Sequence, residues 1–222
     1  MECGRIVLKR LCRDESGISL AEVMVAGAMA SIIATAFLVV FSSFSRSVSL
    51  EESRAAALGE VQEAAANLAA ELRQAAPAVD DGSPAVVLLD SDWATAELVF
   101  FSDRDANAAG PERYRYYVDA CTASHCDLMR ELTVADAAGP PWTFTGTPNV
   151  RRVISNLLIS SDALFQGAEW STGAEVVTTT CDATSPCSFS LVQITLRVDP
   201  DPNISAEAPV HVRHEVRMRN AN

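Results

Sequence analysis

Residues 15–41 read ESGISLAEVMVAGAMASIIATAFLVVF, and this stretch decides how the rest of the chain is organised. From Val23 to Phe41 it holds 19 residues without a charge, close to the roughly 20 that a helix needs to cross a bilayer. Four basic residues precede it: Arg5, Lys9, Arg10 and Arg13. Because positive charges stay cytoplasmic, we expect a single-pass inner-membrane helix with a cytoplasmic N-terminus and an exported C-terminal bulk.

The remaining composition limits the function. The chain has 222 residues, enough for one ordinary domain plus an appendage, and a formal net charge of −12. An acidic surface repels phosphate groups, so we expect no binding of nucleic acid. We also find no motif of a catalytic nucleophile, phosphate loop or zinc protease, and therefore expect a protein that is not an enzyme.

Two ordinary explanations compete for the apolar stretch. A cleaved secretory signal has a shorter apolar run, of about 7 to 15 residues, and ends in a small-residue cleavage site. An uncleaved anchor explains the length and the orientation, but neither Glu22 nor the abrupt change from polar to apolar residues at Gly17 and Ile18. A lipoprotein is excluded, because neither Cys3 nor Cys12 follows an apolar run.

The segment GISLAEVMVA, residues 17–26, resembles the class III signal of type IV pilins and type II secretion pseudopilins. The resemblance implies that a prepilin peptidase cuts after Gly17 and that Ile18 is then N-methylated. It places Glu22 five residues after the cut, where the family has its glutamate. Two departures are mild: Ile18 replaces the commoner Phe, and Ala21 replaces a bulkier aliphatic residue.

Glu22 has a physical reason to be paired. A carboxylate in hydrocarbon costs about 2.5 to 3.5 kcal/mol on insertion scales. In a stack of subunits it can meet the new amine of Ile18 on a neighbour, which offsets that cost and sets the axial register. The alternative is that Glu22 reaches the nearby interface and has no role in assembly.

The helical pattern continues to about Ala76 and stops at Pro77. We expect one helix over 18–76, whose second half lays an apolar stripe on a sheet; the stripe comprises Leu58, Val61, Ala65, Leu68 and Leu72. The predicted fold class is α+β, a long N-terminal helix packed on an antiparallel β-sheet, and the resemblance implies the pilin fold. The predicted divisions are a leader, 1–17, a membrane and assembly half, 18–44, an amphipathic half, 45–76, and a β-rich globular region, 77–222.

Strand-like runs follow from residue 85. They are 85–89, 96–102, 113–120, 127–134, 150–160, 175–180, 190–198 and 210–219. Four cysteines fall near turns between these runs, and their spacing favours the disulfides Cys121–Cys126 and Cys181–Cys187, each at a hairpin tip. Two other pairings exist, and a zinc site using His125 is the rival interpretation.

The globular region is also similar, more loosely, to PilW-type minor pilins and J-type pseudopilins. The similarity lies in the order and character of short segments: AAELRQAAP (69–77), FFSDRDANAAGPERYRYYVD (100–119), MREL (129–132), NVRRVISNLLIS (149–160) and ITLRV with VRHEVRMRN near the end.

Few other residues suggest a site. His211 and His214 lie three apart on a predicted strand, so they should point to opposite faces and make a poor metal pair. Trp93, Trp142 and Trp170 lie in loop-like sequence, where core packing is favoured over contact with a partner. Two runs alternate oxygen ligands as calcium loops do, Asp103–Asp105–Asn107 and Asp199–Asp201–Asn203, but both lack the glycine of an EF-hand and read equally well as turns.

These observations predict a minor pilin that assembles into a type IV pilus, in a tip or initiation complex, and reaches the cell surface. The implied partners are the prepilin peptidase, the major pilin, other minor pilins and the inner-membrane assembly platform. Two alternatives stay open: a pseudopilin of a type II secretion or DNA-uptake system, and a membrane-anchored binding domain that does not polymerise.

Overall fold

The structure is a computed structural model of the whole chain, and it describes residues 19–77, 84–103, 110–136, 139–140, 142–160, 162–171, 174–187, 189–200 and 208–218. The chain divides into two compact units, Met1–Glu51 and Glu52–Asn222, called the N-terminal and C-terminal units below. Gly17 and Ile18, between which cleavage was predicted, lie outside the described residues.

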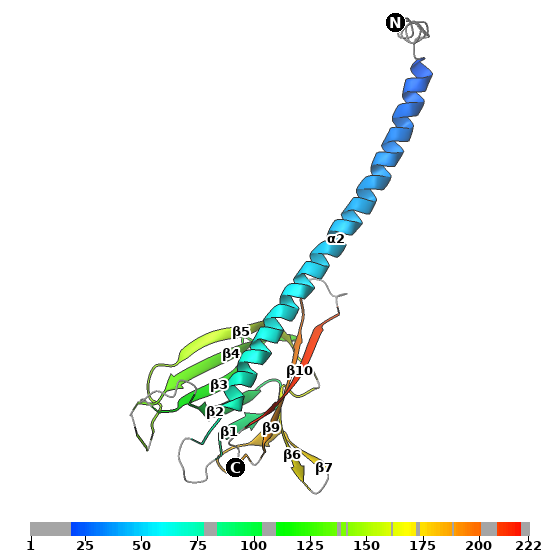
Figure 1. Cartoon of the computed structure of the whole chain (residues 1–222). Coiled ribbons are helices and arrows are strands. Elements are labelled where there is room, and N and C mark those ends of the chain that lie inside the picture. Colours follow the sequence, from blue (N-terminus) through cyan, green and yellow to red (C-terminus); the bar gives the residue numbers. More distant parts are fainter. Residues whose placement is uncertain are drawn as a thin grey trace, which may run out of the picture. The chain divides into compact units, whose positions relative to one another are not determined.

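Helix α2, Leu20–Arg73, runs for 54 residues without interruption (Figure 1). It is slightly shorter than the predicted 18–76, because after Arg73 the backbone turns: Ala75 bridges to Ser102 and the Ala76 N–H donates to the Phe101 carbonyl. The helix is long and apolar enough to cross a membrane, and no residue of its most apolar 18-residue segment is buried. This agrees with a single-pass anchor.

The second half of α2 packs on the sheet through small side chains. Val61, Ala65, Leu68 and Leu72 are buried as predicted, together with three further alanines: Ala57, Ala64 and Ala69. Leu58 is 39% exposed, so its assignment to the stripe was wrong. At this point of the helix Ala57, and not Leu58, lies on the buried face.

Within the described residues, ten strands form one sheet in which every neighbouring pair is antiparallel. They are β1 (Val86–Asp90), β2 (Glu97–Ser102), β3 (Glu112–Asp119), β4 (His125–Val134), β5 (Asn149–Leu158), β6 (Phe165–Ser171), β7 (Ala174–Thr178), β8 (Thr180–Cys181), β9 (Leu191–Val198) and β10 (Val210–Arg217). The α+β class is therefore confirmed.

The sheet curves into a near-barrel. Its strand order is β7-β6-β9-β5-β4-β3-β2-β1-β8, with β10 attached to β9. The two ends of this order are β7 and β8, and one residue, Thr179, separates them in the chain. The β7 and β8 ends of the sheet must therefore lie close together. β1 and β6 lie in contact. This closure is not typical of a pilin sheet.

Two strand predictions need correction. β6 was not predicted, because its sequence FQGAEWS contains a glycine and a charge within a short run. Gly167 has a packing reason to be there: a Cβ atom would lie 2.2 Å from the ring of Phe189. The hairpin predicted between 175–180 and 190–198 does not form, since β7 pairs with β6, β8 with β1, and β9 with β6, β5 and β10.

Candidate functional site: the start of helix α2 and its anchorage

The first described residues form a helix cap. The Ser19 hydroxyl accepts from the Glu22 N–H at 3.2 Å, and a Glu22 carboxylate oxygen accepts from the Ser19 N–H at 3.0 Å and from the Ser19 hydroxyl at 3.2 Å. This reciprocal pattern is a capping box, in which two backbone donors at a helix start are satisfied by side chains. Glu22 therefore has a local structural role beside any role in assembly.

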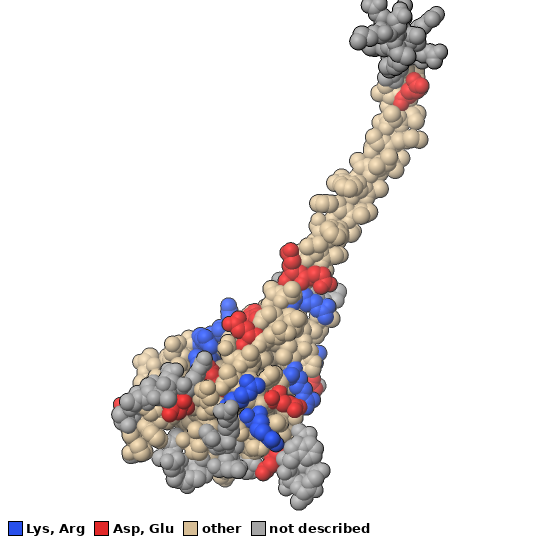
Figure 2. Space-filling model, in the orientation of Figure 1, with Lys and Arg blue, Asp and Glu red and all other residues tan. Residues whose placement is uncertain are grey.

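Glu22 is also the one charged residue between Ser19 and Ser45. Figure 2 shows the corresponding helix surface almost free of charged groups. The hydroxyls within this stretch are satisfied by the helix itself: Ser31 donates to the Ala28 carbonyl at 2.7 Å and Thr35 to the Ser31 carbonyl at 2.8 Å. Such bonds let small hydroxyl side chains enter an apolar phase without an external partner. The surface thus suits lipid or another apolar helix.

A buried ionic cluster joins α2 to the sheet, and the sequence analysis missed it. Glu71 is fully buried, and its carboxylate accepts from Arg130 of β4 at 2.6 and 3.3 Å and from the Tyr116 hydroxyl of β3 at 2.5 Å. The Arg130 guanidinium also lies 4.9 Å from the centre of the Tyr114 ring. Burial, reinforced by the neighbouring Glu71 charge, raises the pKa of Tyr116 far above its ordinary value, so the phenol stays a hydrogen-bond donor.

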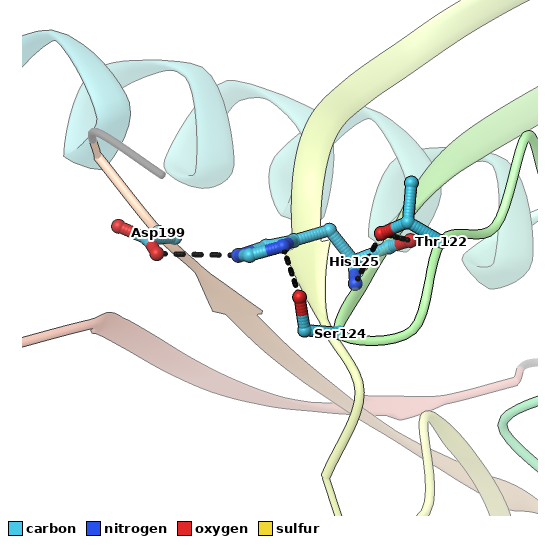
Figure 3. A network of polar contacts seen from close by, with 4 residues as sticks. All are labelled: Thr122, Ser124, His125 and Asp199. Carbon is cyan, nitrogen blue, oxygen red and sulfur yellow. Dashed lines mark hydrogen bonds and ion pairs between the residues drawn. The ribbon is translucent and has the colours of Figure 1, made fainter. Parts of the chain in front are cut away.

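A second polar cluster lies at the tip of the β3–β4 hairpin (Figure 3). His125 has Ser124 Oγ 2.8 Å from its Nδ1 and Asp199 Oδ2 3.2 Å from its Nε2. Its backbone is held as well, since the Thr122 N–H donates to the His125 carbonyl at 2.7 Å. Both ring nitrogens are engaged within the protein, so the arrangement fixes the imidazole in place.

This cluster lies where the sheet is weakly joined. β5 and β9 share one paired position, Leu157 with Val198. Next to it the Asp199 N–H donates to the carbonyl of Asn156, a residue with a φ of 55°. The contact between His125 Nε2 and Asp199 Oδ2 lies at the same place, so it connects β4 to the end of β9 and supports the join.

Both predicted disulfides are present. Cys121–Cys126 closes the β3–β4 hairpin tip, as expected. Cys181–Cys187 was expected at a hairpin tip, but the strands on either side of it do not pair with each other and both cysteines are buried in the core, which corrects that part of the prediction. The zinc alternative is excluded for these four thiols because they are bonded in pairs.

The calcium candidates are only partly described. Asp103 and Asp199 lie within the described residues, whereas Asp105, Asn107, Asp201 and Asn203 lie outside them. Asp199 is engaged with His125. Across the part of the chain that the structure describes, no group of three or more His, Cys, Asp or Glu side chains is placed to hold a metal.

The tryptophans and the two histidines considered as site candidates differ in burial and in their place in the fold. Trp93 is buried, and its indole N–H donates to the Asp162 carbonyl, as core packing predicts. Trp142 packs against Gly110, where a Cβ atom would lie 2.3 Å from the indole Nε1. The φ of 97° at Gly110 is a second reason for glycine at this position. Trp170 belongs to β6 and not to a loop. On β10, His211 is exposed and His214 half-buried, on opposite faces as predicted.

Comparison with protein-family models, with curated proteins and with solved structures gives no match for this chain.

Proposed function

We propose that this chain is a minor pilin, a structural subunit that is cut after Gly17, N-methylated on Ile18 and built through α2 into a type IV pilus, in its tip or initiation complex. The observation that carries the proposal is Glu22, one carboxylate at the start of an otherwise uncharged, exposed helix surface. The near-barrel sheet contributes nothing to it, since the support comes from the N-terminal segment.

An isolated carboxylate at this position is costly, and the leader pattern supplies its partner. Cleavage after Gly17 creates an amine on Ile18, one helical turn from Glu22. Pairing that amine with Glu22 of a neighbouring subunit removes two charges from hydrocarbon contact at once. The expected partners are accordingly the prepilin peptidase, the major pilin, other minor pilins and the assembly platform.

The capping box favours one second candidate. If the carboxylate of Glu22 serves only to satisfy the Ser19 N–H, the chain is a membrane-anchored surface domain that does not polymerise. The two candidates differ in whether the charge itself matters, because glutamine also closes a capping box.

Glu22→Gln is therefore the decisive variant. It keeps the cap and removes the charge, whereas Ser19→Ala removes the cap, at about 1 kcal/mol of helix stability, and keeps the charge. Each variant is expressed in source cells that lack the natural copy. The N-terminal peptide is then quantified by mass spectrometry in membranes and in sheared surface filaments.

For a pilin, Glu22→Gln is cleaved normally but falls at least about tenfold in the sheared fraction, since losing the partner of a desolvated charge costs more than about 1.4 kcal/mol. Ser19→Ala is incorporated nearly normally. Equal incorporation of Glu22→Gln and the natural chain contradicts the proposal, and an uncleaved N-terminus supports the anchored domain. Processed protein that stays in the envelope favours a pseudopilin or an initiator that is retained at the base of the filament.

A further inference from the structure

The strands β6, β7, β9 and β10 form a local four-stranded sheet with two outer edges. β9 pairs with β10 over its full length and with β6 through Leu191–Ile194. β7 pairs with β6, and β10 pairs with β9; among the described residues neither has a second strand partner. An edge strand presents a row of backbone N–H and C=O groups that can template another strand.

The β7 edge also extends beyond the sheet. β6 contacts β9 only through Phe165–Ala168, so the positions from Glu169 to Ser171 pair with β7 alone. Figure 1 shows the β6–β7 hairpin projecting from the neighbouring strands. A two-stranded ribbon is marginally stable in water by itself. A third strand on its open edge would stabilise it.

β7 has little of the usual protection of an edge strand, since Glu175 is its one charged residue. Its sequence AEVVT has no lysine, no proline and no bulge. Val176 is 50% exposed and Val177 is 47% exposed, although they point to opposite faces of the ribbon. An incoming strand therefore finds apolar contacts on both faces. Glu169, paired opposite Val176, is exposed beside them.

β10 has the complementary chemistry. Its sequence VHVRHEVR alternates apolar valines with exposed polar residues, and three of the four exposed positions carry basic residue types: His211, Arg213 and Arg217. Pairing β10 with β10 would bring two net basic strands together, since Glu215 is the one acidic residue among the four exposed positions of β10. Pairing β10 with β7 places the basic side chains of β10 two strand spacings, about 10 Å, from Glu169 on β6, with Val176 between them.

We propose that β7 of one copy of this chain accepts β10 of a second copy, so that the four-stranded sheet continues from one molecule into the next. β7 and β10 of a single copy are separated by β6 and β9, so they cannot pair within one chain. The contact is head-to-tail and adds a strand to an existing edge. It does not depend on the proposed function, because both strands belong to the C-terminal unit.

The first test is the association state of the full chain, reconstituted at one copy per lipid nanodisc so that the membrane helices stay apart. Sedimentation velocity at physiological ionic strength should detect association that grows with concentration. Val176→Lys with Val177→Lys should abolish it, because lysine on an edge blocks strand addition. The matched control is Val150→Lys on β5, where the valine is 45% exposed and association should persist.

A second measurement identifies the strand that is accepted. Copies of natural isotopic composition that carry a photoreactive residue at position 177 are mixed with copies labelled with heavy isotopes. The mixture is then cross-linked by light, and the joined peptides are identified by mass spectrometry. Peptides joining position 177 to heavy Val210–Arg217 support the proposal. Joins to heavy β7, or to any other segment, overturn the assignment of β10. A monomer at about 0.1 mM, where micromolar complexes are saturated, overturns it as well.

The variants must be folded for these results to count. Circular dichroism and the melting temperature of each lysine variant should equal those of the natural chain, since the substituted side chains are about half exposed. Association that persists in a folded Val176→Lys, Val177→Lys chain contradicts the proposal.

Discussion

Replacing Arg130 by methionine should destabilise the C-terminal unit strongly. The substitution keeps an unbranched side chain on β4 but removes the guanidinium that donates to Glu71 at 2.6 and 3.3 Å. Glu71 has no solvent exposure, so water cannot take over those bonds. Removing one partner of a buried ion pair costs about 3–5 kcal/mol. For a unit of this size that corresponds to a fall in melting temperature of about 10 °C.

The double variant tests the reasoning more sharply than either single change. Glu71→Met with Arg130→Met removes both charges together and fills the space with apolar atoms, which is often neutral or even stabilising. The double variant should therefore melt well above Arg130→Met, with a coupling of about 2 kcal/mol or more. Thermal unfolding of the detergent-solubilised chain, followed by circular dichroism at pH 7, measures all three.

Arg115→Met is the matched control. Arg115 lies on β3 and bridges Glu97 at 2.6 Å and Glu131 at 3.2 Å, but its side chain is 33% exposed. An ion pair at that exposure contributes about 1 kcal/mol or less. If Arg130→Met melts no lower than Arg115→Met, or if the two losses in the double variant simply add, then the cluster does not anchor the helix as described.

Two further predictions concern packing and acid stability. Gly167→Ala should cost about 1–3 kcal/mol, because the new methyl group meets the Phe189 ring, whereas Gly59→Ala on the exposed helix face should stabilise the chain by about 1 kcal/mol; both are read from melting temperatures. Hydrogen bonds from the Thr145 N–H and hydroxyl lower the pKa of Asp136, so its stabilisation is present above about pH 4 and lost as the pH falls through the lowered value. Asp136→Asn should flatten the loss of stability below about pH 4, and an unchanged acid transition would contradict this.

The elements that could be predicted from the sequence are those with local causes. The apolar run after Glu22 and the stop at Pro77 define the helix, and alternation within short runs locates most strands. The disulfide Cys121–Cys126 followed from spacing at a hairpin. In each case the deciding contacts lie within a few residues along the chain.

The misses have a different origin. Alanine carries little hydrophobic signal, so the predicted stripe began at Leu58, whereas the neighbouring Ala57 is the buried residue. Glu71 looked like part of the polar helix face, although it lies between Leu68 and Leu72 at the spacing of the buried stripe. That position was the available clue. Its partners Tyr116 and Arg130 are 45 and 59 residues away, and no local pattern indicates such distances.

The closure of the sheet through Thr179 has a consequence for the order of folding. Strands β1 to β5 are neighbours in the sheet in the same order as in the chain, so they can pair one after another while the chain emerges N-terminus first. The outer edge of β1 must wait for β8, because Leu89 pairs with Cys181, more than ninety positions later. Contacts this distant in sequence form slowly. During synthesis or export the outer edge of β1 therefore stays open until β8 has appeared, and the step that gives β1 its second neighbour also brings Cys181 to the core.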